Sequence, residues 1–264
     1  MFGMVKSIWT YRGFVLTSIK NEFVSRFSRS KLGGLWMVVH PLAQVGIYAL
    51  ILSNILSAKL PGIDNKYAYA LYLMAGSLAW NLFSEIVGRC LGLFIENGNL
   101  MKKMSFPRIT LPIIVVGSSL LNNILLFLAV LVVFSLLGQV PNLYMLWVIP
   151  LTLLVVMLAL GIGLVLGVLN VFVRDVGQVV PIILQIWFWF TPIVYPVTII
   201  PEYLKSTLGL NPMFPIVSAY HNVLVYGKAP DLGSVVSIVS FSVVLMLLGL
   251  FMFRRSASEM VDAL

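Results

Sequence analysis

The chain has 264 residues, of which 60% are hydrophobic and only 10% are charged, and its formal net charge is +8. A soluble domain carries about a quarter charged residues, so this composition excludes an ordinary soluble protein and indicates a protein built into a membrane. No polar stretch is long enough to fold separately, and we therefore expect residues 1–264 to form a single transmembrane domain.

Residues 1–33 precede the first long apolar run and are expected on the cytoplasmic side. Between positions 6 and 27, apolar side chains recur at steps of three and four residues, with basic residues interspersed. This spacing predicts an amphipathic helix, because residues three and four apart share one helix face. The helix either lies in the inner membrane interface or packs on the protein itself, and the sequence leaves both interpretations open.

Six apolar runs are long enough to cross a membrane as helices, since a spanning helix needs about 20 apolar residues. They are Trp36–Ser57, Tyr67–Ile95, Leu111–Leu137, Leu143–Phe172, Val179–Tyr195 and Val235–Phe253. The fourth and fifth runs are divided only by residues 173–177, which include Arg174 and Asp175. Charges are unfavourable at the bilayer centre, so we expect this break at a membrane face. The predicted fold is an all-α integral membrane protein with six transmembrane helices.

Residues 196–232, between the fifth and sixth runs, hold five prolines yet are too apolar for a loop in water. Short broken helices that dip back into the membrane fit this composition. Such backbone is tolerated only where protein or a cavity surrounds it. We therefore expect a re-entrant outer segment at 196–232, followed by the sixth span at 235–253 and a cytoplasmic tail at 254–264.

Lysines and arginines are distributed unevenly between the two faces of this arrangement. Twelve fall on the side of the N-terminus, and four (Lys59, Lys66, Lys205 and Lys228) fall on the other side. Cytoplasmic loops are enriched in basic residues, so both ends of the chain are predicted to be cytoplasmic. Because the basic residues flank apolar runs, the positive charge indicates contact with lipid headgroups and argues against nucleic acid.

Two sets of side chains inside the predicted spans are candidates for function. Glu85 and Arg89 are four residues apart, so they share a helix face and are expected to form an intramembrane ion pair. The pair is either structural or beside a water-filled path. Aromatic residues on the second and fifth spans either pack between helices or line a channel for sugar rings. The candidates for channel lining are Tyr72, Trp80, Phe83, Trp187 and Trp189.

Motifs for catalysis and nucleotide binding are absent from the sequence. It contains no G-x-x-x-x-G-K-[ST], no G-x-S-x-G and no H-E-x-x-H. The histidines are His40 and His221 and the cysteine is Cys90, so no Cys/His cluster has metal-ligand spacing. We expect neither an enzyme nor a metal or cofactor site in this chain. Gly163 and Gly167 form a small-xxx-small pattern, which allows helices to approach closely.

Several segments carry a family resemblance, and they follow one another in order along nearly the whole chain. They are Gly33–Trp36 with His40-Pro41, Met101–Pro107, Asn170–Gln178, Gln185 with Trp189–Tyr195, and Asn211–Pro215. In this combination the chain resembles the permeases of the second type of ABC exporter, in the polysaccharide-export branch. It is most similar to the Wzm-type permeases for lipid-linked O-antigen. His40 and His221 depart from the residues common in relatives, and no family role is carried over to them.

The resemblance implies a homodimer in the bacterial inner membrane, paired with two copies of a separate cytoplasmic ATPase that binds ATP and Mg. The implied substrate is undecaprenyl-pyrophosphate-linked polysaccharide. The expected contact with the ATPase comprises Lys102, Lys103, Phe106, Arg174 and Asp175.

Arg26, Arg29 and Lys31 lie between the amphipathic helix and the first span, at the depth of the inner headgroups. Arginine meets phosphate oxygens with two parallel hydrogen bonds, so we expect these residues to contact the pyrophosphate of the substrate. The alternative is that they only enforce orientation and contact anionic lipids.

The sequence is also compatible with other functions. One is a permease of the same family that exports a capsule polymer, a teichoic acid or a drug. Another class comprises an ATP-independent carrier or a membrane enzyme acting on lipid-linked sugar. The sequence shows no internal repeat and no convergent acid/base or metal site, which disfavours both the carrier and the enzyme.

Overall fold

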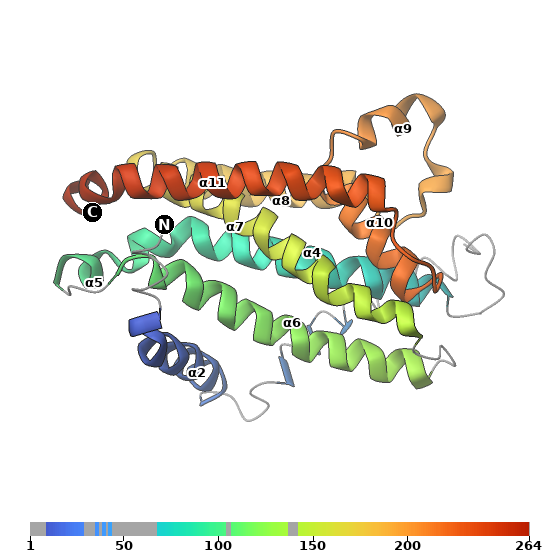
Figure 1. Ribbon diagram of the computed structural model, residues 1–264, viewed down its shortest axis with the longest axis horizontal. Helices are drawn as coiled ribbons and strands as arrows, with labels where there is room; N and C mark the ends of the chain where they lie inside the picture. Colours follow the sequence, from blue (N-terminus) through green and yellow to red (C-terminus); the bar gives the residue numbers. More distant parts are fainter. Residues whose placement is uncertain are drawn as a thin grey trace.

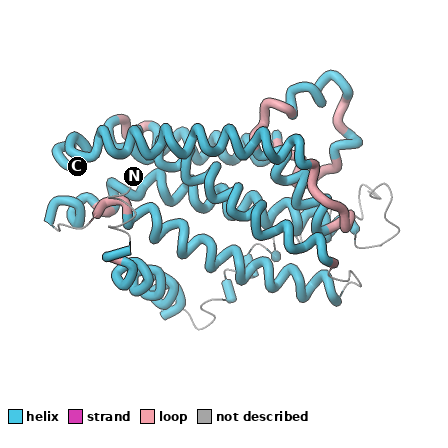
Figure 2. The backbone as a smooth tube through the Cα atoms, viewed as in Figure 1, coloured by secondary structure: helices cyan, strands magenta, loops and turns pink. Residues whose placement is uncertain are grey.

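The computed structural model describes residues 9–28, 35–36, 39–40, 42–43, 68–103, 107–136 and 142–263. Every regular element in this part of the chain is a helix (Figure 1, Figure 2). In chain order the helices are α2 (Arg12–Ser28), α4 (Ala68–Glu96), α5 (Gly98–Lys103), α6 (Thr110–Leu136), η1 (Leu143–Trp147), α7 (Val148–Phe172), α8 (Val176–Phe190), η2 (Val197–Ile199), α9 (Glu202–Leu208), α10 (Met213–Leu224) and α11 (Leu232–Ala263).

Four helical stretches are long and apolar enough to cross a membrane. They are Ala68–Glu96, Thr110–Ser135, Leu143–Phe172 and Leu232–Ala257. These stretches coincide with the predicted second, third, fourth and sixth spans, and they confirm an all-α, multi-pass membrane protein. Most of the predicted first span, 36–57, lies outside the described residues.

The helix at the predicted fifth span is shorter than the apolar run that predicted it. α8 has 15 residues and ends at Phe190. At 1.5 Å per residue it is about 22 Å long, less than the roughly 30 Å of a bilayer core. The cause is local: Pro192 disfavours helical backbone at the residue before it, and Thr191 is extended, with φ −101° and ψ 129°.

The helix at the predicted sixth span is longer than the run 235–253. α11 continues without a break to Ala263, so most of the predicted tail is part of this helix. Its start is capped by Asp231, whose carboxylate accepts hydrogen bonds from the backbone amides of Gly233 and Ser234, both at 3.3 Å. Such a cap satisfies amides that have no partner within the helix.

The centre of the bundle is α4, which packs against α6, α7, α8 and α10. Eighteen of its 29 residues are buried, and Phe83 and Phe94 are among the largest fully buried side chains. α11 packs on α7 and leaves a wide apolar face uncovered, where Val236, Val244 and Phe251 are at least 60% exposed. Lipid tails satisfy such a face, whereas water does not.

Glycines allow the central helices to approach closely. A Cβ added at Gly163 would lie 2.8 Å from the Cβ of Cys90, and one at Gly167 would fall against the carbonyl oxygen of Cys90. The small-xxx-small pattern therefore makes a close contact between α7 and α4 of the same chain. On the opposite side of α7, a Cβ at Gly161 would lie 2.8 Å from the amide nitrogen of Met246 in α11.

The two ends of the bundle carry different structures (Figure 1). α5, the turn between α7 and α8, and the C-terminal end of α11 lie at one end. α9 and α10 lie at the other end, where α9 projects away from the bundle. α10 instead packs against α4, α7, α11 and η1. The chain therefore turns back into the bundle at 213–224, with Ile216, Tyr220 and Val223 fully buried.

Candidate functional site

Arg89 lies at the centre of a polar cluster that joins three helices. Its Nη2 is 2.5 Å from a carboxylate oxygen of Glu22 in α2, and its Nη1 is 3.5 Å from one of Glu85 in α4. Nη1 also donates hydrogen bonds to Ser118 Oγ at 2.7 Å and Ser119 Oγ at 3.2 Å in α6. The expected pair of Glu85 and Arg89 is thus part of a larger network that includes a second carboxylate.

The sequence analysis missed the partners of Arg89 on other helices. Asn122 of α6 extends the network, since its Nδ2 donates to Glu85 at 2.8 Å. One signal was available: Ser118, Ser119, Asn122 and Asn123 are polar residues close together inside an apolar span. No local pattern pointed to Glu22, which lies 67 positions before Arg89.

A pocket of about 550 Å³ adjoins this cluster, between α2, α4, α5 and α6. Glu22, Arg89 and Glu96 lie on its polar side, and Phe14 and Ile114 on its apolar side. The three charged side chains of the cluster are each 22–27% exposed. The cluster is therefore neither dry nor freely solvated, and its ion pairs are stronger than surface pairs without being sealed from water.

The predicted ATPase contact maps to one end of the bundle. Lys102 is exposed in α5, and Arg174 and Asp175 are exposed in the turn between α7 and α8. Figure 1 places α5 and this turn at the same end of the molecule. Lys103 ends α5, but its side chain is outside the described part, and Phe106 lies outside the described residues.

A further basic residue at this end has a structural role. Arg108 donates a hydrogen bond to the backbone carbonyl of Ala257, which ties the start of α6 to α11.

Of the predicted pyrophosphate contacts, Arg26 belongs to α2 with a side chain outside the described part. Arg29 and Lys31 lie outside the described residues.

The five aromatic residues predicted to line a channel divide into two groups. Trp187 packs edge to face on Trp80 and Phe83, which are tilted against each other, and the ring centroids of the three are 5.1–6.1 Å apart. Phe83 and Trp80 are 0% and 6% exposed. The rings of Trp80 and Phe83 are therefore buried where α4 meets α8, whereas Trp187 of α8 is half-buried. Trp189, on the other side of α8, is 52% exposed.

Tyr72, the last of these five residues, is 3% exposed and holds α10 in place. Its ring stacks on His221 of α10 with centroids 3.6 Å apart, and His221 Nε2 donates to its carbonyl oxygen at 3.1 Å. The hydroxyls of Tyr220 and Thr152 are 2.8 Å apart. α10 is therefore anchored to both α4 and α7 by polar contacts inside an apolar core.

Asn211 makes a second anchor, just before α10. Its Oδ1 accepts hydrogen bonds from Trp187 Nε1 at 2.8 Å and from the amide of Met213 at 3.0 Å. Its Nδ2 donates to Thr191 Oγ1 at 2.9 Å. One side chain thus joins the end of α8 to the start of α10. The sequence analysis did not single out this side chain as functional.

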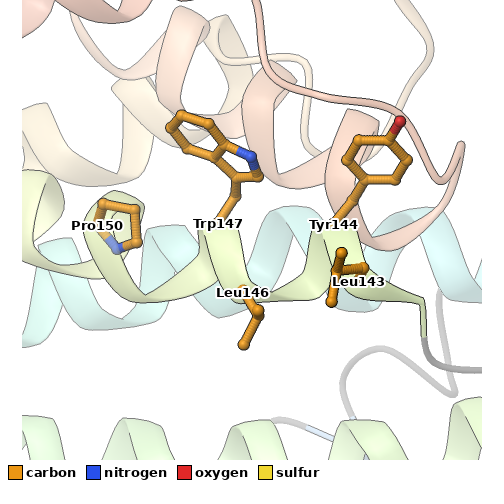
Figure 3. Close-up of a pocket in the computed structure, with 5 residues that line it drawn as sticks. All are labelled: Leu143, Tyr144, Leu146, Trp147 and Pro150. Carbon is orange, nitrogen blue, oxygen red and sulfur yellow. The ribbon is translucent and has the colours of Figure 1, made fainter.

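Two more pockets lie at the end that carries the outer segment. One, of about 490 Å³, is lined by Trp189, Phe190, Tyr195 and residues of η2 and α9. The other, of about 600 Å³, adjoins η1 and the start of α7 (Figure 3). In Figure 3 the rings of Tyr144 and Trp147 point to one side of the helix, away from Leu146. Both pockets are mainly apolar and aromatic, as expected near a membrane surface.

No group of three or more His, Cys, Asp or Glu side chains suited to a metal ion occurs among the described residues. The described side chains instead show positioning and pairing: an arginine between two carboxylates, and aromatic and amide anchors for α10.

Comparison with known proteins shows similarity to one family of transporters and to several permeases and transport proteins. Residues 14–225 match the family described as ABC-2 type transporter. The chain is 27% identical to the O-antigen export system permease protein RfbA of Myxococcus xanthus over 266 positions, which cover 100% of both chains. A permease of the same name from Klebsiella pneumoniae is 28% identical over 87% of this chain and 86% of its own. The polysialic acid transport protein KpsM of Escherichia coli is 24% identical over 92% and 93%.

Proposed function

Because the chain belongs to the ABC-2 type transporter family, we propose that it is the membrane subunit of an ATP-driven exporter of lipid-linked polysaccharide, with O-antigen as the substrate. The observation that carries the proposal is the end-to-end match to a permease named for O-antigen export. A second permease of that name and a polysialic acid transport protein match over most of their length. The protein is a transport subunit, and we assign ATP hydrolysis to a partner.

The chemistry of the substrate explains why a dimer is needed. A glycan carries hydroxyl groups on every sugar, and burial in lipid would leave them without hydrogen-bond partners. The path must therefore be hydrated and enclosed by protein. We propose that two copies of this chain enclose it between them. Trp189 is the aromatic candidate for its lining, because its ring is exposed while Trp80 and Phe83 are not.

We further propose six spans, with α8 as a short fifth one and both ends of the chain in the cytoplasm. This topology rests on the twelve-to-four distribution of basic residues across the two faces. The helices α9 and α10 then form the outer re-entrant segment, in which the buried α10 supports the assignment. The membrane is the bacterial inner membrane.

Two copies of a cytoplasmic ATPase are the proposed partners, and they would bind the ATP and Mg. The contact would lie at the bundle end with α5 and the α7–α8 turn, through Lys102, Arg174 and Asp175. Support comes from the exposure of these three charged side chains at one end of the molecule. Lys103 and Phe106 belong to the same proposed surface by their position in sequence.

Arg26, Arg29 and Lys31 are the proposed contacts of the substrate pyrophosphate, at the inner headgroups. Arg29→Lys keeps the charge that sets topology and loses the bidentate geometry for phosphate. Export should therefore fall while membrane insertion stays normal. If Arg29→Lys and Arg26→Lys both export at the normal rate, these residues act only in orientation.

The function is tested by deleting the gene and restoring it from a plasmid. Deletion should abolish the surface polysaccharide and cause undecaprenyl-pyrophosphate-linked glycan to accumulate inside the cell. The matched control restores the permease in a strain whose partner ATPase cannot hydrolyse ATP, and it should give the same two changes. A normal surface glycan in the deletion strain would refute the proposal. The identity of the missing glycan separates O-antigen from a capsule polymer, which would redirect the substrate assignment.

A further inference from the structure

Among the described residues, a stripe of side chains on the N-terminal helix α2 contacts the bundle. Val15, Ile19 and Glu22 follow at steps of four and three residues, so they share one face of the helix. Val15 is 6% exposed, where α2 packs on α6. The side chain of Ile19 fills a notch at Gly117 of α6, with Cγ1 only 3.2 Å from where a Cβ would be. Leu16, next to this stripe, is 65% exposed.

The third member of the stripe makes the charged contact between α2 and α4. Glu22 is 2.5 Å from Nη2 of Arg89, while Glu85, on the same helix as Arg89, is 3.5 Å from Nη1. Arg89 also donates to Ser118 and Ser119 of α6. Nη1 also donates to the backbone carbonyl of Val115 at 3.5 Å, so among the described residues the guanidinium has one partner on the N-terminal helix and four that belong to the bundle.

This division of partners determines what happens if α2 moves away. An arginine left without a counter-charge in a low-dielectric site is strongly unfavourable. Here Glu85 and the two serine hydroxyls would stay beside Arg89, and the adjoining pocket of about 550 Å³ is large enough for water molecules. Separation of α2 then breaks one ion pair without leaving the arginine unpaired.

We propose that Arg89 is a positioning residue with two alternative states. Paired with Glu22 it holds α2 against the bundle, and paired with Glu85 alone it releases α2 during the transport cycle. The proposal rests on the proposed function in one respect, namely that ATP used by the partner ATPase drives the release. Arg89 acts on α2, a segment of the same chain, and couples α2 to α4 and α6.

Two conservative changes in the cluster are expected to act in opposite directions. Glu22→Gln removes the charge that holds α2, so the released state becomes more populated. Glu85→Gln removes the counter-charge that stabilises Arg89 after release, and it also removes the repulsion between two carboxylates that share one arginine. The attached state is then favoured. A cluster with a purely structural role would respond differently, because loss of either partner would loosen it.

The measurement is maleimide labelling of a cysteine introduced at Val15, in inverted membrane vesicles that contain the complete exporter. This position is accessible only when α2 leaves α6, so the labelling rate reports the released population. Glu22→Gln should raise the rate by about tenfold, the effect of losing one charge-assisted hydrogen bond. Glu85→Gln should lower the rate below that of the parent. Addition of ATP to the parent should raise it.

Two internal controls are available in the same chain. A cysteine at Leu16 is exposed in either state and should label at an unchanged rate in every variant. Cys90 is fully buried in the bundle, so its labelling in the parent without the new cysteine reports global unfolding. Arg89→Lys provides a third variant that keeps the charge, and it should give a rate between those of the parent and Glu22→Gln.

The outcomes separate the possibilities. A rise for both Glu22→Gln and Glu85→Gln, with Cys90 still protected, would overturn the proposal in favour of a structural cluster. Unchanged rates in both would mean that packing on α6 alone holds α2, which also overturns it. If the two variants shift in opposite directions and ATP has no effect, the two-state pairing stands and ATP-driven release of α2 is overturned. The proposed function fails only if the deletion strain keeps a normal surface glycan. Failure of each is therefore recognised separately.

Discussion

A substitution of Gly161 tests the close backbone contact between α7 and α11. Gly161 lies on α7 where α11 crosses it, and Gly249 of α11 lies directly opposite. A Cβ added at Gly249 would lie 2.9 Å from the carbonyl oxygen of Gly161. In Gly161→Ala the new methyl group would be 2.8 Å from the amide nitrogen of Met246 and 2.9 Å from the carbonyl carbon of Leu245. Both are backbone atoms, so no side chain can rotate to make room.

The magnitude follows from this geometry. An ordinary contact begins at 3.4 Å, so α7 and α11 would have to separate by roughly 0.6 Å. Overpacking of this kind destabilises by about 1–3 kcal/mol, while the higher helix propensity of alanine returns about 1 kcal/mol. Helices in lipid gain little from the hydrophobic effect, and their association depends on van der Waals contact. We therefore expect a net loss of up to about 2 kcal/mol in the free energy of unfolding, which is about 1–3 kcal/mol relative to an alanine that meets no clash.

The assay is the unfolding midpoint of the purified protein in detergent, compared with that of Gly88→Ala. Gly88 lies on α4 with no heavy atom within 4 Å of the position of a Cβ, so alanine fits there without displacement. This control should be neutral or more stable by up to about 1 kcal/mol. If Gly161→Ala is as stable as Gly88→Ala, the close approach of α7 and α11 does not exist as described.

Three other changes should have measurable effects. His221→Ala removes the ring stack and the hydrogen bond with Tyr72 and leaves a cavity. It should lower the free energy of unfolding by about 2–4 kcal/mol. An unchanged unfolding temperature would argue against this anchor. Lys102→Glu should weaken co-purification of the ATPase, whereas Lys205→Glu, at the opposite end, should not; equal retention of the ATPase removes Lys102 from the contact. Cysteines placed at Lys205 and Arg254 should label from outside and inside the cell respectively, and external labelling at Arg254 contradicts the topology.

Much of the helical architecture could be predicted from local properties of the sequence. The apolar runs at 67–95, 111–137 and 143–172 correspond closely to α4, α6 and the pair of η1 and α7, because the length of an apolar run is a property of consecutive residues. Where the prediction of length failed, at α8, the reason was also local. Pro192 ends the helix although the apolar composition continues to Tyr195.

The candidate site was predictable only in part. The spacing of Glu85 and Arg89 placed them on one helix face, and the structure has them 3.5 Å apart. The shorter contact of Arg89, with Glu22, joins helices that are far apart in sequence. In the same way, the aromatic pattern identified Trp80 and Phe83 as a group but did not show that they are buried against Trp187.

The sequence by itself determined which stretches become helices, which faces of them are apolar, and where basic residues accumulate, because these depend on neighbours within a few positions. The tertiary structure alone decided which faces meet. The motif at Gly163 and Gly167 predicted a close helix contact but not the helix that makes it. In the structure both glycines pack against Cys90 of α4. Periodicity specifies the direction of a side chain around its own helix axis. Its partner is decided only when all the helices pack together, because an arginine then pairs with a carboxylate of α2 and a glycine contacts the backbone of another helix.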